Sequence, residues 1–105
     1  MNNNILTKKE IVDLIQQSTT RLESLGIQAI GLFGSFARGE ETEQSDIDIL
    51  VQFVAAKKNF DNFIETCFFL DELFQRKVEL VTTDSLSPYI KPYIIKEVEY
   101  VPLAH

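Results

Sequence analysis

Two aspartates separated by one residue, Asp46 and Asp48, begin an apolar segment that continues to Phe53. Successive side chains of an extended strand point to opposite faces, so both carboxylates project from one face and the apolar residues from the other. Two carboxylates on one face can bind a single hard cation. The segment from Glu40 to Asp48 holds five carboxylates and no lysine or arginine, so a cation from elsewhere is needed to offset their repulsion.

The cation that these residues favour is Mg²⁺. This ion is bound by a few carboxylates together with substrate phosphates and keeps several of its waters. Zinc prefers cysteine and histidine ligands. The chain contains one cysteine, Cys67, and one histidine, His105, so the residues predict a metal and phosphate site and argue against a zinc site.

A turn that can bind phosphates precedes the acidic pair. Gly34 follows an apolar run and permits a backbone conformation closed to other residues, and Ser35 can open a short helical turn that reaches Arg38. Free N–H groups at such a turn face an anion, while the Ser35 hydroxyl and the fixed charge of Arg38 add further contacts to a triphosphate. The motifs GxxxxGK[ST] and GxGxxG are absent. Three plainer interpretations stay open: a solvated strand edge for the aspartates, a helix cap for Ser35 and a surface ion pair for Arg38.

These residues form a pattern with a known counterpart. Gly34-Ser35-x-Ala37-Arg38-Gly39, followed by Ser45-Asp46-x-Asp48, closely resembles the signature of the DNA polymerase β-like nucleotidyltransferases. The short chain resembles the minimal nucleotidyltransferases, which are often the antitoxins of pairs with a HEPN-domain toxin. The resemblance covers about residues 27–101. It implies an α/β (α+β) nucleotidyltransferase fold, in which a small mixed β-sheet carries the acidic site and helices pack against it.

The resemblance also implies a third carboxylate on a neighbouring strand. Glu79 matches that position, although many relatives have aspartate there. Asp71 and Asp84 are competitors, but Asp71 falls on a predicted helix and Asp84 lies past the end of the strand. Two charges 4 Å apart repel by about 4 kcal/mol at an effective dielectric constant of 20. Without a cation, one of the carboxyls Asp46, Asp48 and Glu79 is therefore expected to stay protonated, or the side chains to splay.

The implied reaction is nucleotidyl transfer that uses ATP and two Mg²⁺ ions held by Asp46, Asp48 and Glu79. An acceptor hydroxyl attacks the α-phosphate and pyrophosphate leaves, held by Gly34, Ser35 and Arg38. The resemblance implies that AMP is added to a hydroxyl, with tyrosine the first candidate, of a cognate HEPN toxin that can also form a hetero-oligomer with this chain. Two alternatives stay open: an antitoxin that acts by binding alone, and an aminoglycoside-type enzyme, which usually needs additional chain.

Hydrophobic periodicity predicts six elements around these residues. The helix at the start begins with a capping box between Thr7 and Glu10. The last helix begins with Ser87 as its cap and Pro88 at its first position. A stripe of aromatic residues in the middle helix, from Phe60 to Phe74, and Cys67 within it are assigned to the core rather than to base stacking. The predicted elements are helix 8–25, strand 27–33, strand 46–53, helix 60–75, strand 78–82 and helix 88–98, with loops at 39–44 and 54–58.

Length and charge limit the class of protein. A chain of 105 residues, 45% hydrophobic and with eight phenylalanines, predicts a single domain over residues 1–105. The net charge of −6 argues against direct binding to nucleic acid and favours a protein or small-molecule acceptor. A single cysteine, the lack of a signal peptide and the absence of an apolar stretch of about 20 residues predict a cytoplasmic protein without membrane contact.

Overall fold

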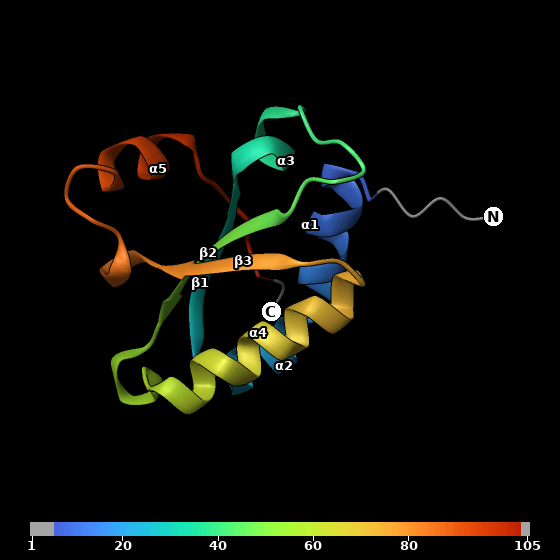
Figure 1. The fold of residues 1–105 in the computed structure, drawn as a ribbon. Coiled ribbons are helices and arrows are strands. Elements are labelled where there is room, and N and C mark those ends of the chain that lie inside the picture. Colours follow the sequence, from blue (N-terminus) through green and yellow to red (C-terminus); the bar gives the residue numbers. More distant parts are fainter. Residues whose placement is uncertain (1–5, 104–105) are drawn as a thin grey trace.

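The fold is built on a four-stranded mixed sheet in the order β3-β2-β1-β4, seen in a computed structural model that describes residues 6–103 (Figure 1). Strand β1 is antiparallel to both of its neighbours, whereas β2 and β3 are parallel. The sheet confirms the predicted mixed α/β class. The strands are β1 Ile27–Phe33, β2 Ile47–Phe53, β3 Val78–Thr82 and β4 Glu99–Tyr100.

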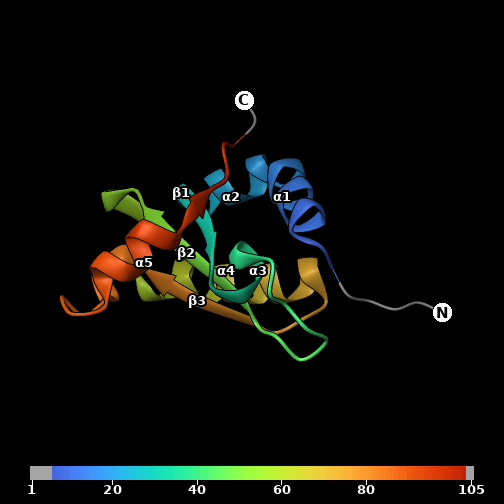
Figure 2. The same ribbon diagram turned by 90° about the horizontal axis from the view of Figure 1, so that it is seen from above.

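Five helices pack around this sheet. In Figure 1, α2 and α4 lie below the sheet, and α3 and α5 lie above it, so the two faces of the sheet have different neighbours. Figure 2 shows α5 crossing over the sheet on the side of β3 and β2. The helices are α1 Lys8–Gln17, α2 Thr19–Ser24, α3 Gly34–Arg38, α4 Phe60–Phe74 and α5 Lys91–Glu97, and two short 3₁₀ turns cover Ala55–Lys57 and Thr83–Ser85.

The core lies between the sheet and α1, α2 and α4, and α3 adds Phe36 and Ala37 to it. Ile47 and Ile49 of β2 are fully buried there against Leu70 and Phe74 of α4, as the alternation of apolar residues in β2 predicts. The assignment of Phe60 to the core is wrong. Its side chain is 75% exposed, because it is the first residue of α4 and adjoins the exposed turn at residues 55–57. Cys67 is half-buried, and burial, aided by the charge of Asp71, raises the pKa of its thiol.

The prediction of one helix over residues 8–25 is wrong, because the chain breaks at Ser18. The backbone of Ser18 leaves the helical region with a ψ of 15°, and the Thr19 hydroxyl donates to the Gln16 carbonyl at 2.9 Å. Hydroxyl side chains that bond to nearby backbone groups compete with the regular helical pattern. Ser18 and Thr19 therefore separate α1 from α2.

The last helix begins three residues later than predicted. The Ser87 hydroxyl accepts the N–H groups of Tyr89 and Ile90, at 3.2 and 3.4 Å, which forms a turn rather than the first turn of the helix. Helix α5 then starts at Lys91, and Pro92 lies in its first turn, where a missing N–H is tolerated. The two-residue strand β4 that follows was not predicted.

The predicted absence of a signal peptide rests partly on residues 1–5, which lie outside the described residues, as does His105. Within residues 6–103, every helix is too short or too polar to cross a bilayer.

Candidate active site

The parallel pairing of β2 with β3 brings two predicted site residues side by side. Asp48 lies directly opposite Glu79 in the register of the two strands, and Phe33 of β1 lies on the other side of Asp48. Asp46 immediately precedes β2, and the strand alternation puts its side chain on the face of Asp48. The three predicted carboxylates therefore share the face of the sheet opposite the buried residues Ile47 and Ile49.

Asp48 has the most perturbed carboxyl of this group. Burial raises its pKa to about 6, and the negative charges of Glu79, Asp46 and Glu97 add to the rise, while the charge of Arg38 opposes it. Each of these carboxylates disfavours the charged form of Asp48. The site therefore holds more negative charge than its own cations offset.

Asp46 has turned toward a lysine. The Nζ atom of Lys77 lies 3.8 Å from Oδ2 of Asp46, because the register that pairs Ile47 with Val78 also sets Asp46 beside Lys77. Across residues 6–103, no three histidine, cysteine or acidic side chains are grouped closely enough to hold a metal ion. The carboxylates share a face but are splayed, one of the two arrangements expected without a cation.

The residues nevertheless fit Mg²⁺. This ion needs only one or two carboxylates when substrate phosphates and waters complete its shell. Burial and the neighbouring carboxylates raise the pKa of Asp48, and the nearby charge of Arg38 offsets this rise only in part. A divalent cation would add positive charge beside Asp48, and phosphate oxygens and waters would complete its shell, because the described residues form no closed cage of ligands.

The Gly34 turn packs directly against Asp48. Gly34 has a φ of +76°, and a Cβ atom built on it would lie 2.0 Å from Oδ2 of Asp48, so a side chain here meets both backbone strain and a clash. Helix α3 starts at this glycine, one residue before the predicted start at Ser35, with Phe33 at its N-cap position. Ser35 is therefore inside the helix, and the interpretation of its side chain as a helix cap is wrong.

The charge of Arg38 is shared between two carboxylates. Its Nε donates to Glu40 and its Nη1 donates to Glu97, both at 2.9 Å, and these bonds raise the pKa of the guanidinium. The interpretation of Arg38 as a surface ion-pair residue is therefore confirmed. A guanidinium can exchange such exposed partners for phosphate oxygens.

Glu97, at the end of α5, is a site residue that sequence reasoning missed. One of its carboxylate oxygens accepts a hydrogen bond from the Gly34 N–H at 2.8 Å. The other accepts the hydrogen bond from Nη1 of Arg38. The Gly34 N–H, followed by Arg38, lowers the pKa of the Glu97 carboxyl. The two residues Gly34 and Glu97 are 63 positions apart, so no local pattern signals their contact.

Arg76 binds the backbone of the acidic loop rather than its carboxylates, so it is not the cation that this segment was predicted to need. Its guanidinium donates to the carbonyls of Ser45 and Thr42, at 2.7 and 2.6 Å, and lies 5.4 Å from the centre of the Phe36 ring. These contacts hold the loop between α3 and β2 in place. The predicted competitors of Glu79 are engaged elsewhere, since Asp71 accepts the Val78 N–H and Asp84 pairs with Lys58.

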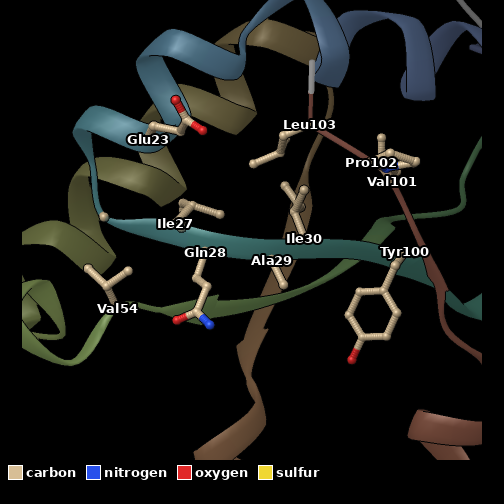
Figure 3. Close-up of a pocket in the computed structure, with 11 residues that line it drawn as sticks. Glu23, Ile27, Gln28, Ala29, Ile30, Val54, Tyr100, Val101, Pro102 and Leu103 are labelled. Carbon is tan, nitrogen blue, oxygen red and sulfur yellow. The ribbon is translucent and has the colours of Figure 1, made fainter. Parts of the chain in front are cut away.

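A separate hollow of about 480 Å³ lies at the far end of β1 (Figure 3). It is bordered by the end of α2, the free edge of β1 and the segment after β4, and the side chains of Tyr100 and Gln28 reach into its mouth. None of the six predicted site residues lines it, and Glu23 is its one acidic residue. The hollow has no grouping of chemically active side chains comparable with that around Asp48.

Comparison with known proteins shows the family of this chain. Residues 14–101 match the family model of the nucleotidyltransferase domain. The protein adenylyltransferase MntA of Thermococcus cleftensis is 39% identical over 98 residues, which cover 92% of this chain and 98% of that protein.

Two solved structures share the fold. A structure described as a candidate minimal nucleotidyltransferase superposes with a TM-score of 0.81 at 24% identity, covering 96% of this chain and all of the other. A complex of a tri-AMPylated HEPN toxin of Shewanella oneidensis with its MNT antitoxin matches with a TM-score of 0.56 at 22% identity, over 85% of this chain and 72% of the other. At these identities the two structures establish the fold alone.

Proposed function

This chain belongs to the nucleotidyltransferase family, and we propose that it transfers AMP from ATP to a tyrosine hydroxyl of a cognate HEPN-domain toxin. It acts as a single minimal domain over residues 1–105, in the cytoplasm. The observation that carries the proposal is the position of Asp48. Its carboxyl lies opposite Glu79 on the neighbouring strand and against Gly34, so the acidic group and the phosphate-binding turn are adjacent.

Each site residue has one task in this proposal. Asp46, Asp48 and Glu79 hold Mg²⁺, which when bound offsets the charge of the triphosphate and lowers the pKa of the acceptor hydroxyl. The Gly34 N–H and the Ser35 hydroxyl hold the phosphates that leave as pyrophosphate. Arg38 adds a fixed positive charge to the same phosphates. The attacking hydroxyl comes from the partner protein.

The choice of a protein acceptor has two supports. The relative from Thermococcus cleftensis is named a protein adenylyltransferase, and the Shewanella oneidensis structure is described as an AMPylated HEPN toxin with its antitoxin. The net charge of −6 on this chain favours approach to a basic partner such as an RNA-binding toxin. An AMP group adds negative charge and bulk where such a toxin handles RNA, which silences it without continuous binding.

The test uses the purified chain with the toxin encoded beside it. The pair is incubated with Mg²⁺ and each of the four nucleoside triphosphates, and the toxin is mapped by mass spectrometry. We expect AMP on a hydroxyl side chain with ATP, and a loss on the order of 100-fold or more in the Asp46→Asn, Asp48→Asn double variant. Asp61→Asn, which removes an exposed carboxylate of α4, is the control that keeps full activity.

The competing outcome is equally definite. If the toxin stays unmodified while both the parent and the double variant neutralise it, neutralisation proceeds by binding alone. Transfer of the nucleotide to an aminoglycoside, with none to the toxin, would instead support the small-molecule enzyme.

A further inference from the structure

We propose that Glu97 is an internal competitor of the triphosphate: its carboxylate occupies the groups that bind the phosphates and leaves them when a nucleotide binds. This inference rests on the proposed function, since it concerns the phosphate contacts of the same site. It assigns to α5 a part in nucleotide binding that neither the signature motif nor the acidic residues indicate.

The geometry of the contact is that of a bound anion. One oxygen of Glu97 lies 2.8 Å from the Gly34 nitrogen, and the other lies 2.9 Å from Nη1 of Arg38. A carboxylate and a phosphate both present two oxygens to such a pair of donors. The Gly34 N–H has a single hydrogen, so it donates fully either to Glu97 or to a phosphate.

Charge also favours an exchange of partners. The lowered pKa of Glu97 keeps it ionised at neutral pH, and its charge already contributes to the raised pKa of Asp48. A triphosphate brings several more negative charges into this cluster. Repulsion by the phosphates therefore weakens the bonds of Glu97 to Gly34 and Arg38. The triphosphate, which carries more charge than a carboxylate, can then bind the same two donors.

The movement required is a rotation of one side chain. The backbone that follows Glu97 is fixed, because Val98 packs so closely on Gly31 that a Cβ atom built on Gly31 would lie 2.6 Å from Cγ2 of Val98. Glu99 then pairs with Leu32 in the sheet. The Glu97 side chain itself is 29% exposed, so it can turn toward solvent while α5 stays in place.

The experiment measures binding of ATP with Mg²⁺ by titration calorimetry, in the absence of any acceptor. Glu97→Gln keeps the shape of the side chain and removes its charge, and we expect it to bind ATP about fivefold more tightly than the parent. Inorganic tripolyphosphate should show the same gain, and adenosine should show none. A residue that merely braces the turn would give the opposite result, namely weaker binding in the variant.

Glu99→Gln is the matched control, since Glu99 also carries an ion pair, with Lys8, but makes no contact with Gly34 or Arg38. It should leave ATP affinity unchanged. Glu97→Asp, which keeps the charge but is too short to reach both donors, provides a second variant and should also bind ATP more tightly. Thermal melts establish that each variant is folded.

The outcomes separate the two proposals. If the parent binds ATP and neither Glu97 variant binds it more tightly, the competitor role is wrong while the proposed function stands. If neither the parent nor any variant binds ATP or tripolyphosphate, both the proposed function and the inference drawn from it are wrong.

Discussion

The two faces of β2 differ in what they contribute to the protein. On one face, Ile47 and Ile49 are fully buried against the helices and stabilise the fold. On the other face, burial and the neighbouring carboxylates raise the pKa of Asp48 to about 6, an arrangement that works against folding once this carboxyl is ionised. The comparison teaches that one short strand supplies both the stability and the site, and that the site depends on the core directly behind it.

The largest effect is expected on the buried face. Ile49→Ala should lower the free energy of unfolding by about 3 kcal/mol, because it removes buried methyl groups and leaves a cavity. Urea unfolding measures the loss. Gln52→Ala, an exposed position on the same strand, should change stability by less than about 0.5 kcal/mol. A loss for Ile49→Ala as small as that of the control would mean that β2 does not anchor the core.

An intermediate effect is expected where the Gly34 turn meets Asp48. Gly34 and Gly39 have nearly the same backbone, with φ of +76° and +73°, but a Cβ atom meets Asp48 only at Gly34 and has open space at Gly39. Gly39→Ala should therefore cost about 1 kcal/mol for strain alone, and Gly34→Ala roughly 1 to 2 kcal/mol more for the clash. Equal melting temperatures for the two variants would show that a Cβ atom at position 34 does not clash with Asp48.

The smallest effect is a gain in stability on the charged face. Because the pKa of Asp48 rises from 3.8 to about 6 on folding, the folded protein binds this proton more tightly and loses stability as the pH rises through that range. Asp48→Asn should therefore stabilise the metal-free protein by about 1 kcal/mol at pH 8, a value reduced for the partial exposure of the group.

The pH dependence is the check on this last prediction. The advantage of Asp48→Asn should shrink below pH 6 and become small near pH 4, close to the unfolded pKa of 3.8, below which the parent carboxyl is protonated in both states. Glu43→Gln, which removes an exposed charge from the acidic loop, serves as the control in unfolding experiments at both pH values. A stabilisation that persists unchanged at pH 4 would exclude relief of charge as its cause.

Local patterns were enough to predict much of the fold. Strands β1 and β3 have the predicted ranges of 27–33 and 78–82, because short apolar runs there are bounded by glycines or polar residues. The break at Ser18 was not predicted, since apolar residues recur at helical spacing on both sides of it. The break depends on the Thr19 hydroxyl, which donates a hydrogen bond to the Gln16 carbonyl and so competes with the regular helical hydrogen bonds.

Most of the predicted site residues follow one another in sequence, and Glu79, on the neighbouring strand, was predicted only from the resemblance to the family. Gly34, Ser35, Arg38, Asp46 and Asp48 lie within one stretch, whereas Glu97 contacts Gly34 across 63 positions. The neighbour of Asp46 is a different case. Strand β3 is parallel to β2, with Val78 opposite Ile47, and this register places Lys77 beside Asp46. The contact between Lys77 and Asp46 therefore follows from the sheet topology and register, and not from the local sequence pattern.

The parallel pairing of β2 with β3 also affects when the protein becomes active during its synthesis. Parallel neighbours require a crossover, here α4, before the second strand can join the first. On the ribosome, Asp46 and Asp48 emerge well before Glu79 and remain without it until α4 and β3 have followed. The nascent chain therefore cannot assemble its acidic site early, and a partner made at the same time meets a competent enzyme only after most of this chain has been translated.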